Sequence, residues 1–113
     1  MESTSVDQGM KFDTEKVRTD LHSVPAFLGT CAVLTYGAKK YAAWNWSKGI
    51  NYMRVYGALI RHVTSWVMGQ KLDEETGLPH LDHAACCIMF LQHYDRHEEK
   101  YKAFDDRPYG KIA

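Results

Sequence analysis

The sequence has no excess of charge of either sign and no long hydrophobic run. Its 14 lysines and arginines balance 14 aspartates and glutamates over 113 residues. Proteins that bind nucleic-acid polymers are as a rule basic, so this balance argues against a nucleic-acid polymer as partner. No apolar stretch approaches the roughly 18 residues that span a bilayer, and residues 1–10 are too polar for a signal peptide. We expect a soluble cytoplasmic protein with no membrane partner.

Cysteine is scarce, and the common phosphate-binding and nucleophile motifs are absent. The three cysteines, Cys31, Cys86 and Cys87, have neither metal-ligand spacing nor an even number for disulfides. The adjacent pair is interpreted as two small buried hydrophobes. Without a Walker loop, a GxGxxG motif or a nucleophile elbow, kinase, Rossmann and serine-hydrolase functions have no support. No segment repeats or alternates as a strand does, which predicts an all-α fold.

The spacing of apolar residues predicts three main helices. The first covers about residues 25–40, with Ser23 as its N-cap and Pro25 in its first turn. The second covers residues 52–68, between a cap at Asn51 and a stop at Gly69. The third and longest opens at Pro79 and runs to about residue 103.

Around these helices we expect a disordered tail at 1–10, one α-helical domain at 11–104 and a loose tail at 105–113. Three helices of this length leave much of each apolar stripe without a partner. We therefore expect a small helical bundle that is completed by assembly into a homodimer or a higher homo-oligomer.

The neutral total conceals two halves of opposite charge. The 52 residues from Leu21 to Leu72 contain no acid, whereas residues 73–106 contain nine acids and three basic residues. In one interpretation the halves pair within the fold or across a dimer. In the other, the basic half binds an anion and the acidic half helps to hold a metal.

Histidines and carboxylates cluster around the second loop. His80 and His83 are three residues apart and share one helix face. A short loop makes the second and third helices antiparallel, so His62, about two turns before the loop, faces His83. The loop adds Asp73, Glu74 and Glu75. Together they form a candidate site for a divalent metal. Because imidazole is a poor ligand for Mg, the site is better suited to a softer divalent metal than to Mg.

The cluster of His62, His80 and His83, and a second pair formed by His93 and His97, also have a structural interpretation. His80 is then a residue of the helix start, His83 a hydrogen-bonded core residue, and the acids a solvated loop. His93 and His97 are four residues apart, but charged residues follow them at once. We interpret that second pair as part of an exposed face.

Basic and aromatic residues flank the first loop. Arg54 and Arg61 are seven residues apart and share a face of the second helix, and Lys39 and Lys40 close the first helix. All four are candidate phosphate contacts. Tyr41, Asn45 and Trp46 lie between these cations in the sequence; aromatic rings stack on bases, and an amide can read a base edge. The alternatives are helix capping for the lysines and a core-covering loop for the aromatics.

Several motifs together resemble one known family. They are KFD at 11–13, VLTYGAKKY at 33–41, NW at 45–46, ALIRH at 58–62, DEETGLPHL at 73–81 and HA at 83–84. Over about residues 11–94 they resemble the dATP/dGTP diphosphohydrolase N-terminal domain family. That family is largely phage-encoded and is similar to the all-α MazG-like nucleotide pyrophosphatases.

The resemblance implies a metal-dependent hydrolase that cuts dGTP or dATP to a monophosphate and pyrophosphate, in the host cytoplasm if a phage encodes it. Water activated by a divalent metal (Mn, Mg, Co or Zn) would attack the α-phosphorus. The metal would lie among His62, His80 and His83 with Asp73 or Glu75. Candidate catalytic residues are His62, Glu75 and His83. Phosphate contacts would be Lys39, Lys40, Arg54 and Arg61, and nucleoside contacts Tyr41, Asn45 and Trp46.

The sequence departs from the MazG-like pattern in one respect. Those enzymes hold magnesium with ExxE on one helix and ExxD on the next, and neither motif occurs here. Either the metal is a softer one, or the site binds a nucleotide without hydrolysing it. A non-catalytic protein that sequesters nucleotides, and an architectural helical oligomer whose charged halves pair, are therefore the alternatives to an enzyme.

Overall fold

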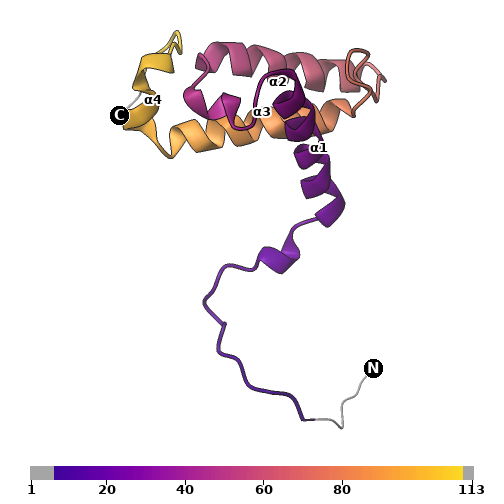
Figure 1. The fold of residues 1–113 in the computed structure, drawn as a ribbon, viewed down its shortest axis with the longest axis vertical. Coiled ribbons are helices and arrows are strands. Elements are labelled where there is room, and N and C mark those ends of the chain that lie inside the picture. Colours follow the sequence, from indigo (N-terminus) through magenta and orange to yellow (C-terminus); the bar gives the residue numbers. More distant parts are fainter. Residues whose placement is uncertain (1–6, 111–113) are drawn as a thin grey trace.

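The computed structural model describes residues 7–110, which fold into helices joined by short loops (Figure 1). The three long helices are α1 (Val24–Lys40), α2 (Tyr52–Val67) and α3 (His80–Asp95). A short helix, α4 (Glu98–Tyr101), follows them. Single 3-10 turns are η1 (Thr19–Leu21), η2 (Asn45–Lys48) and η3 (Lys102–Phe104). Residues 7–110 contain no strand, only an isolated bridge between Leu72 and Pro79. The all-α prediction is confirmed.

The centre of the fold is an antiparallel hairpin of α2 and α3, against which α1 packs through α3 (Figure 1). The close approach of α1 to α3 depends on a glycine, because a Cβ added to Gly29 would overlap the carboxylate of Asp82. The start of α1 and the residues before it project away from the hairpin. The hairpin therefore carries most of the packing, and α1 covers one side of α3.

The ends of α1 and α2 agree with their local sequence signals. Ser23 caps α1, its Oγ accepting a hydrogen bond from the Ala26 amide at 3.2 Å. Asn51 occupies the N-cap position of α2, although its side chain makes no capping hydrogen bond. Gly69, with φ +97°, follows the end of α2 in the left-handed conformation that terminates helices.

The third helix is shorter than the apolar spacing predicts. It ends at Asp95, and His97 leaves the helical region with φ −131° and ψ 48°. The turn folds Tyr101 of α4 back beside Tyr94, with ring centroids 4.6 Å apart, and both rings are buried. The prediction of one helix to residue 103 was wrong. The apolar spacing continues past Asp95, but the chain turns there and brings the Tyr101 ring against the Tyr94 ring.

The buried core clamps the loop between α1 and α2. Val55, Cys87, Tyr94 and Tyr101 form one buried cluster, against which Trp46 packs. The Tyr94 hydroxyl donates to the carbonyl of Trp46 at 2.6 Å, and the Tyr101 hydroxyl donates to that of Ser47 at 2.6 Å. Two tyrosines from α3 and α4 thus hold the η2 turn in place. Cys86 is buried too, as predicted for both adjacent cysteines.

The C-terminal segment lies against the start of α2. The Met53 amide donates to the Asp106 carboxylate at 2.9 Å, and the Arg107 guanidinium lies over the Tyr52 ring. Residues 1–6 and 111–113, parts of the two predicted tails, lie outside the described residues, and the boundaries of the 11–104 domain stay a prediction. None of the helices between residues 7 and 110 combines the length and apolar character needed to cross a membrane.

Candidate metal and nucleotide site

The turn of the α2–α3 hairpin brings three candidate ligands together. One ligand atom each of His62, Asp73 and His80 lies within 4.8 Å of the others. The Nδ1 atoms of His62 and His80 are 2.9 Å apart. The connecting loop is closed by backbone hydrogen bonds, including Asp73 amide to Leu78 carbonyl at 2.8 Å. The predicted antiparallel arrangement, with His62 facing the start of α3, is confirmed.

Hydrogen bonds define which ring nitrogen of His80 is protonated and which one accepts a hydrogen bond. The Gln70 side-chain amide nitrogen donates to the Glu74 carboxylate at 3.3 Å, which directs the Gln70 carbonyl oxygen to His80 Nε2 at 3.1 Å. His80 Nε2 therefore carries a proton, and its Nδ1 accepts the hydrogen bond from His62. A second-layer oxygen that fixes the tautomer in this way is usual for metal-binding histidines.

The three donors fit a divalent metal of the kind that imidazole binds. Two nitrogens that each lie 2.0–2.1 Å from a tetrahedral metal are separated by about 3.3 Å, close to the observed His62–His80 distance. Two imidazoles and one carboxylate leave a fourth position open for water, as in catalytic zinc sites. The chemistry of the set favours Zn, Mn or Co over Mg.

His83 belongs to a hydrogen-bonded relay beside these three residues. Its Nε2 lies 2.7 Å from the Thr76 hydroxyl, which donates to the Asp73 carboxylate at 3.1 Å. Because the hydroxyl has one proton to donate, it accepts from His83, whose Nε2 is then protonated. The His83 ring stacks on His62, with centroids 4.5 Å apart and planes 6° apart. The second nitrogen of His83, Nδ1, is its basic atom.

The electrostatics of the site favour neutral imidazoles and an ionised carboxylate. Burial lowers the pKa of His62, helped by repulsion from His83, and the attraction of Asp73 does not reverse this. Burial also lowers the pKa of His83. For Asp73, burial raises the pKa, but the hydrogen bonds from Thr76 outweigh it and leave the pKa below its ordinary value. These are the protonation states that bind a cation.

A pocket of about 290 Å³ opens beside the cluster. Its apolar walls include Leu34, Ile50 and Phe90. Of the predicted site residues, eight line it: Lys40, Tyr41, Asn45, Trp46, His62, Asp73, Glu75 and His83. The Lys40 ammonium pairs with the Glu75 carboxylate at 3.1 Å, joining the end of α1 to the loop before α3. The structure therefore gathers the predicted nucleoside contacts, one predicted phosphate contact and part of the metal cluster.

The other predicted residues lie elsewhere. Arg61 lines a separate polar hollow of about 320 Å³, together with His62, Asp73 and His80. His62 and Asp73 are thus shared by both spaces. Lys39 and Arg54 are exposed and line neither. For all these residues the assigned roles stay predictions.

The aromatic loop covers the core, and its role in nucleoside binding stays a prediction. The Trp46 ring stacks on Phe90 at 5.0 Å, so it covers the core while it also borders the pocket. His93 packs edge-on against the same ring at 5.0 Å and is half-buried, so it is less exposed than its charged neighbours predict.

Sequence reasoning missed the residues that support the site. Gln70 orients His80, Thr76 joins His83 to Asp73, and Tyr94 and Tyr101 fix the loop of Asn45 and Trp46. The seven-residue spacing of the tyrosines suggests one side of a single helix, whereas Tyr94 lies in α3 and Tyr101 in α4. No local signal shows that their hydroxyls reach a loop some 50 residues earlier.

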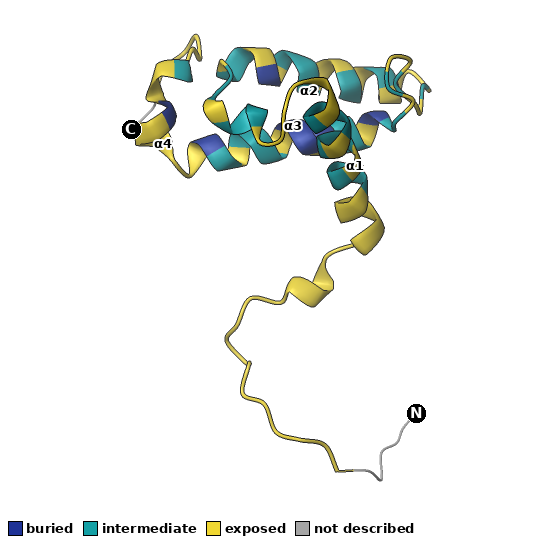
Figure 2. Ribbon diagram, in the orientation of Figure 1, coloured by how far each residue is buried: buried dark blue, intermediate teal, exposed yellow. Residues whose placement is uncertain are grey.

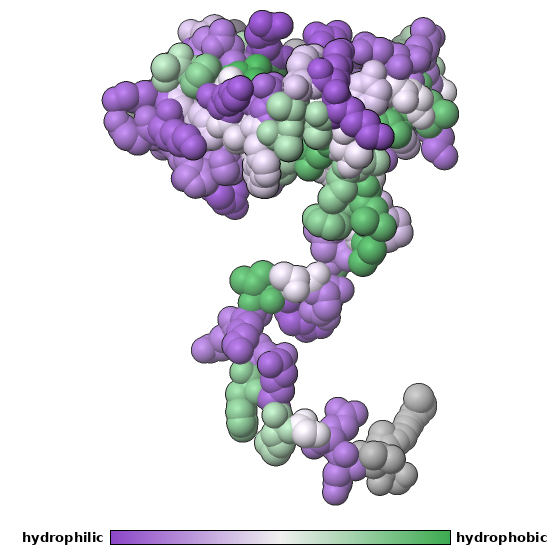
Figure 3. Space-filling view, in the orientation of Figure 1, coloured by the Kyte–Doolittle hydropathy of each residue, from purple (hydrophilic) through white to green (hydrophobic). Residues whose placement is uncertain are grey.

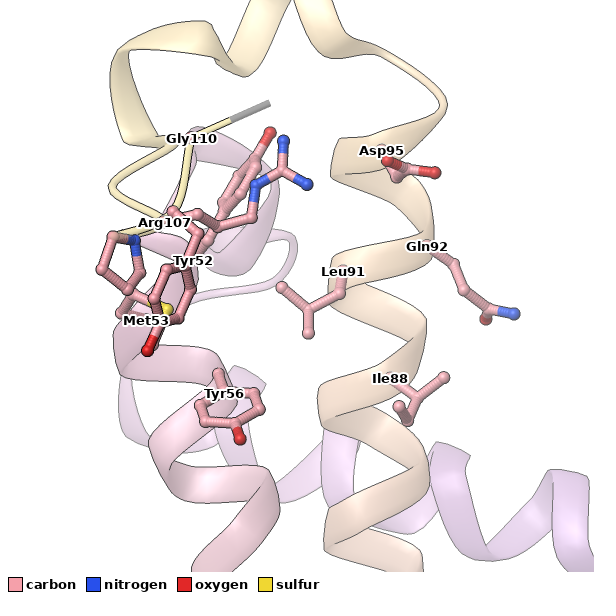
Figure 4. A pocket seen from close by; sticks show the side chains of 11 residues that line it. Tyr52, Met53, Tyr56, Ile88, Leu91, Gln92, Asp95, Arg107 and Gly110 are labelled. Atoms are coloured by element: carbon pink, nitrogen blue, oxygen red, sulfur yellow. The ribbon is translucent and has the colours of Figure 1, made fainter. Parts of the chain in front are cut away.

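A further hollow of about 740 Å³ lies at the opposite end of the hairpin (Figure 4). Tyr52 and Tyr56 of α2 face Leu91 of α3 across it, and Arg107 to Gly110 close one side. None of the predicted site residues lines this hollow.

Comparison with known proteins agrees with the resemblance in the motifs. A dATP/dGTP diphosphohydrolase of Salmonella phage PMBT28 is 39% identical over 84 residues, 74% of this chain. The chain spans 28% of the length of that relative. No solved structure matches significantly. The family described as dATP/dGTP diphosphohydrolase, N-terminal, matches residues 6–107. The chain therefore belongs to the dATP/dGTP diphosphohydrolase N-terminal family.

Proposed function

We propose that the pocket binds a purine deoxynucleoside triphosphate, dGTP or dATP, and that the chain hydrolyses it to a monophosphate and pyrophosphate. The observation that carries the proposal is the sharing of His62 and Asp73 between the candidate metal cluster and the pocket. The substrate and the reaction follow those of the longer phage relative, a dATP/dGTP diphosphohydrolase. The nucleotide pool would be that of an infected host's cytoplasm.

The proposed divalent metal would be held by His62, Asp73 and His80, and when bound it would activate water and neutralise phosphate charge. The residues of the chain then divide the remaining work. His83, protonated at Nε2 by its bond to Thr76, offers Nδ1 to take up a proton. Lys40 and Arg61 provide cations on the two sides of the cluster.

Glu75, a candidate catalytic residue from the sequence, would act in this scheme by positioning Lys40. Its carboxylate pairs with the Lys40 ammonium, which places that cation at the edge of the pocket. Asn45 and Trp46, held by the two buried tyrosines, would contact the nucleoside.

Ion chromatography of reactions with dGTP or dATP tests the proposal, with Mn, Mg, Co, Zn or no metal added. We expect monophosphate and pyrophosphate with a metal that imidazole binds and none after chelation. His62→Ala should abolish the reaction, whereas His97→Ala, an exposed histidine outside the cluster, should not. No product with any metal would refute hydrolysis by this chain.

The absence of ExxE and ExxD favours one alternative, a site that binds the nucleotide without cutting it. Heat denaturation of the complex distinguishes the two. A sequestering protein releases intact triphosphate, and an enzyme releases products. An architectural oligomer would bind neither, and its thermal stability would not respond to nucleotide.

A further inference from the structure

The N-terminal arm, residues 7–22, meets α1 only at its root, where the His22 ring lies edge-on to Phe27. Every residue of the arm is exposed, and the arm extends away from the helices (Figure 2). Four large apolar side chains lie along it, with exposed fractions of 81% for Met10, 82% for Phe12, 88% for Val17 and 72% for Leu21. Figure 3 shows hydrophobic side chains along the arm and continuing onto the start of α1. Apolar exposure of this extent in a short segment marks an interaction surface.

The chain exposes more surface than a compact monomer of its mass, because the arm is extended. Its accessible surface is 9160 Å², whereas a folded monomer of 13.0 kDa exposes roughly 6,300 Å². The excess remains about 1,800 Å² if the nine residues outside the described range are counted at the full exposure of an extended chain. Stable homodimers bury between about 1,000 and 2,500 Å² on each subunit. The excess therefore matches what one subunit contributes to a dimer.

One apolar groove in the described structure lies open to receive such a segment. This α1–α3 groove has a volume of about 920 Å³. Phe27, Cys31 and Leu34 of α1 and Ile88 and Met89 of α3 line it, together with Trp44. The hollow in Figure 4 is less suitable because residues 107–110 of the same chain already close one side of it.

Trp44 is held at the edge of this groove in a costly conformation. Its φ is +65°, a left-handed value that a bulky side chain seldom adopts, and its side chain is 69% exposed. The indole tilts against Trp46, with centroids 5.6 Å apart. A strained, exposed tryptophan beside an apolar groove is the arrangement expected of a contact residue.

We propose that the arm of one copy fills the α1–α3 groove of a second copy, and that the exchange is reciprocal in a homodimer. The sixteen residues of the arm would reach up to about 50 Å if fully extended, and α1, with 17 residues, is about 26 Å long. The arm is thus long enough to follow the groove of a partner. The family match begins at residue 6, so the arm is part of the domain that the family shares.

Of the arm, only its last residue, His22, lines the groove of its own chain, and the residues before it lead away from the helices. Ser23 is committed as the N-cap of α1 through its bond to Ala26, and the preceding backbone leads outward from there (Figure 1). Folding back would require the chain to reverse at this cap. A second copy meets no such constraint.

The exchange also bears on the candidate nucleotide pocket. Leu34, Ala38 and Trp46 line both the groove and that pocket, so they form the wall between them. An arm seated in the groove packs this wall from behind. This consequence rests on the proposed function, whereas the exchange itself does not.

Sedimentation equilibrium and light scattering across a concentration series test the exchange without nucleotide. The wild type should be a dimer. The arm variant Phe12→Asp/Leu21→Asp should raise its dissociation constant at least about 100-fold, because two apolar anchors are lost on each arm. The matched control Thr14→Asp/Thr19→Asp adds the same charges to the arm and should leave the dimer intact. A wild type that is monomeric throughout, or a dimer indifferent to the arm variant, would overturn the proposal.

Complementation shows that the contact joins two copies. Phe27→Asp changes the groove at a residue that is 58% exposed, so the variant is expected to fold. Alone, this groove variant and the arm variant should both be monomers. Mixed, they should form a heterodimer in native mass spectrometry, since one intact arm meets one intact groove. Failure of the mixture to associate would contradict reciprocal exchange.

Cysteine labelling provides a second readout with an internal control for folding. Cys31 lines the groove and is half-buried, whereas Cys86 and Cys87 are buried in the core. An occupied groove protects Cys31, so the arm variant should label faster there while the other two cysteines stay unlabelled. Equal Cys31 rates in the wild type and the arm variant would argue that the arm does not occupy the groove.

Discussion

The Nδ1 atoms of His62 and His80 lie 2.9 Å apart across the turn of the α2–α3 hairpin, where one ring donates and the other accepts. The bond is possible only if one nitrogen is unprotonated, and the contact of His80 with Gln70 shows which one it is. Asp73 completes a set of three possible metal ligands. The hairpin thus places an unprotonated imidazole nitrogen, His80 Nδ1, beside the Asp73 carboxylate.

Loss of one of these ligands should impair metal binding specifically. We expect His62→Ala to weaken binding of Zn or Mn at least about 100-fold, more than the 10–100-fold typical of losing a second-layer partner. Isothermal titration calorimetry checks this, with His97→Ala as the control. Unchanged affinity in His62→Ala would exclude the cluster as the metal site.

The stability of the metal-free protein should fall as the pH falls from neutral. Folding lowers the pKa of both His62 and His83 below 6.5, so the unfolded chain binds more protons. The stabilisation is complete above pH 6.5 and is lost as the pH drops through the lower, folded-state pKa values. Urea unfolding between pH 8 and pH 5 measures the slope. His62→Gln/His83→Gln should flatten it, and an unaltered slope would assign the effect to other groups.

Lys40 should contribute to ligand binding but little to folding. Its pair with Glu75 is solvent-exposed, and exposed pairs contribute about 0–1 kcal/mol. We expect Lys40→Ala to change the free energy of unfolding by less than about 1 kcal/mol and to weaken dGTP binding about tenfold. Lys39→Ala is the matched control because Lys39 is exposed and does not line the pocket. Equal binding losses in the two variants would indicate a general charge effect.

The buried Tyr94 hydroxyl should support both the fold and the pocket. Tyr94→Phe leaves the Trp46 carbonyl without its donor inside the core, which costs about 1–3 kcal/mol. The freed loop should also bind nucleotide more weakly, since it carries Asn45. Denaturant unfolding and nucleotide titration measure the two effects. Tyr56→Phe, at a half-exposed ring on α2, should alter neither.

Two glycine substitutions should shift stability in opposite directions. Gly49 has φ +111°, and a Cβ there would overlap the Phe104 ring, so Gly49→Ala should cost more than about 1 kcal/mol. Gly37 lies within α1 with open space around it, so Gly37→Ala should add about 0.5–1 kcal/mol. Thermal unfolding of both variants checks the pair. A loss of stability in Gly37→Ala would show that α1 needs its flexibility or has a neighbour there.

The sequence by itself determined the helical class, the limits of α1 and α2, and the approach of His62 to α3. Each depends on short-range chemistry: the cap at Ser23, the left-handed stop at Gly69, and a loop too short for anything but an antiparallel turn. Tertiary structure alone decided where α3 ends, because the break at His97 allows Tyr101 to be buried beside Tyr94. It also separated Lys40, which lines the pocket, from its neighbour Lys39, which does not.

The same limit applies to the support of the site and to the arm. Periodicity reports which side of a helix is buried, but it does not report which distant group covers that side. The hydroxyls that hold Trp46 and Ser47 come from residues 94 and 101, and the bond from Gln70 to His80 depends on the loop's closed shape. Nor does the local sequence show that the apolar residues of the arm find no partner within the chain. That follows only once the helices have packed, because the backbone before the cap at Ser23 then leads away from the helices.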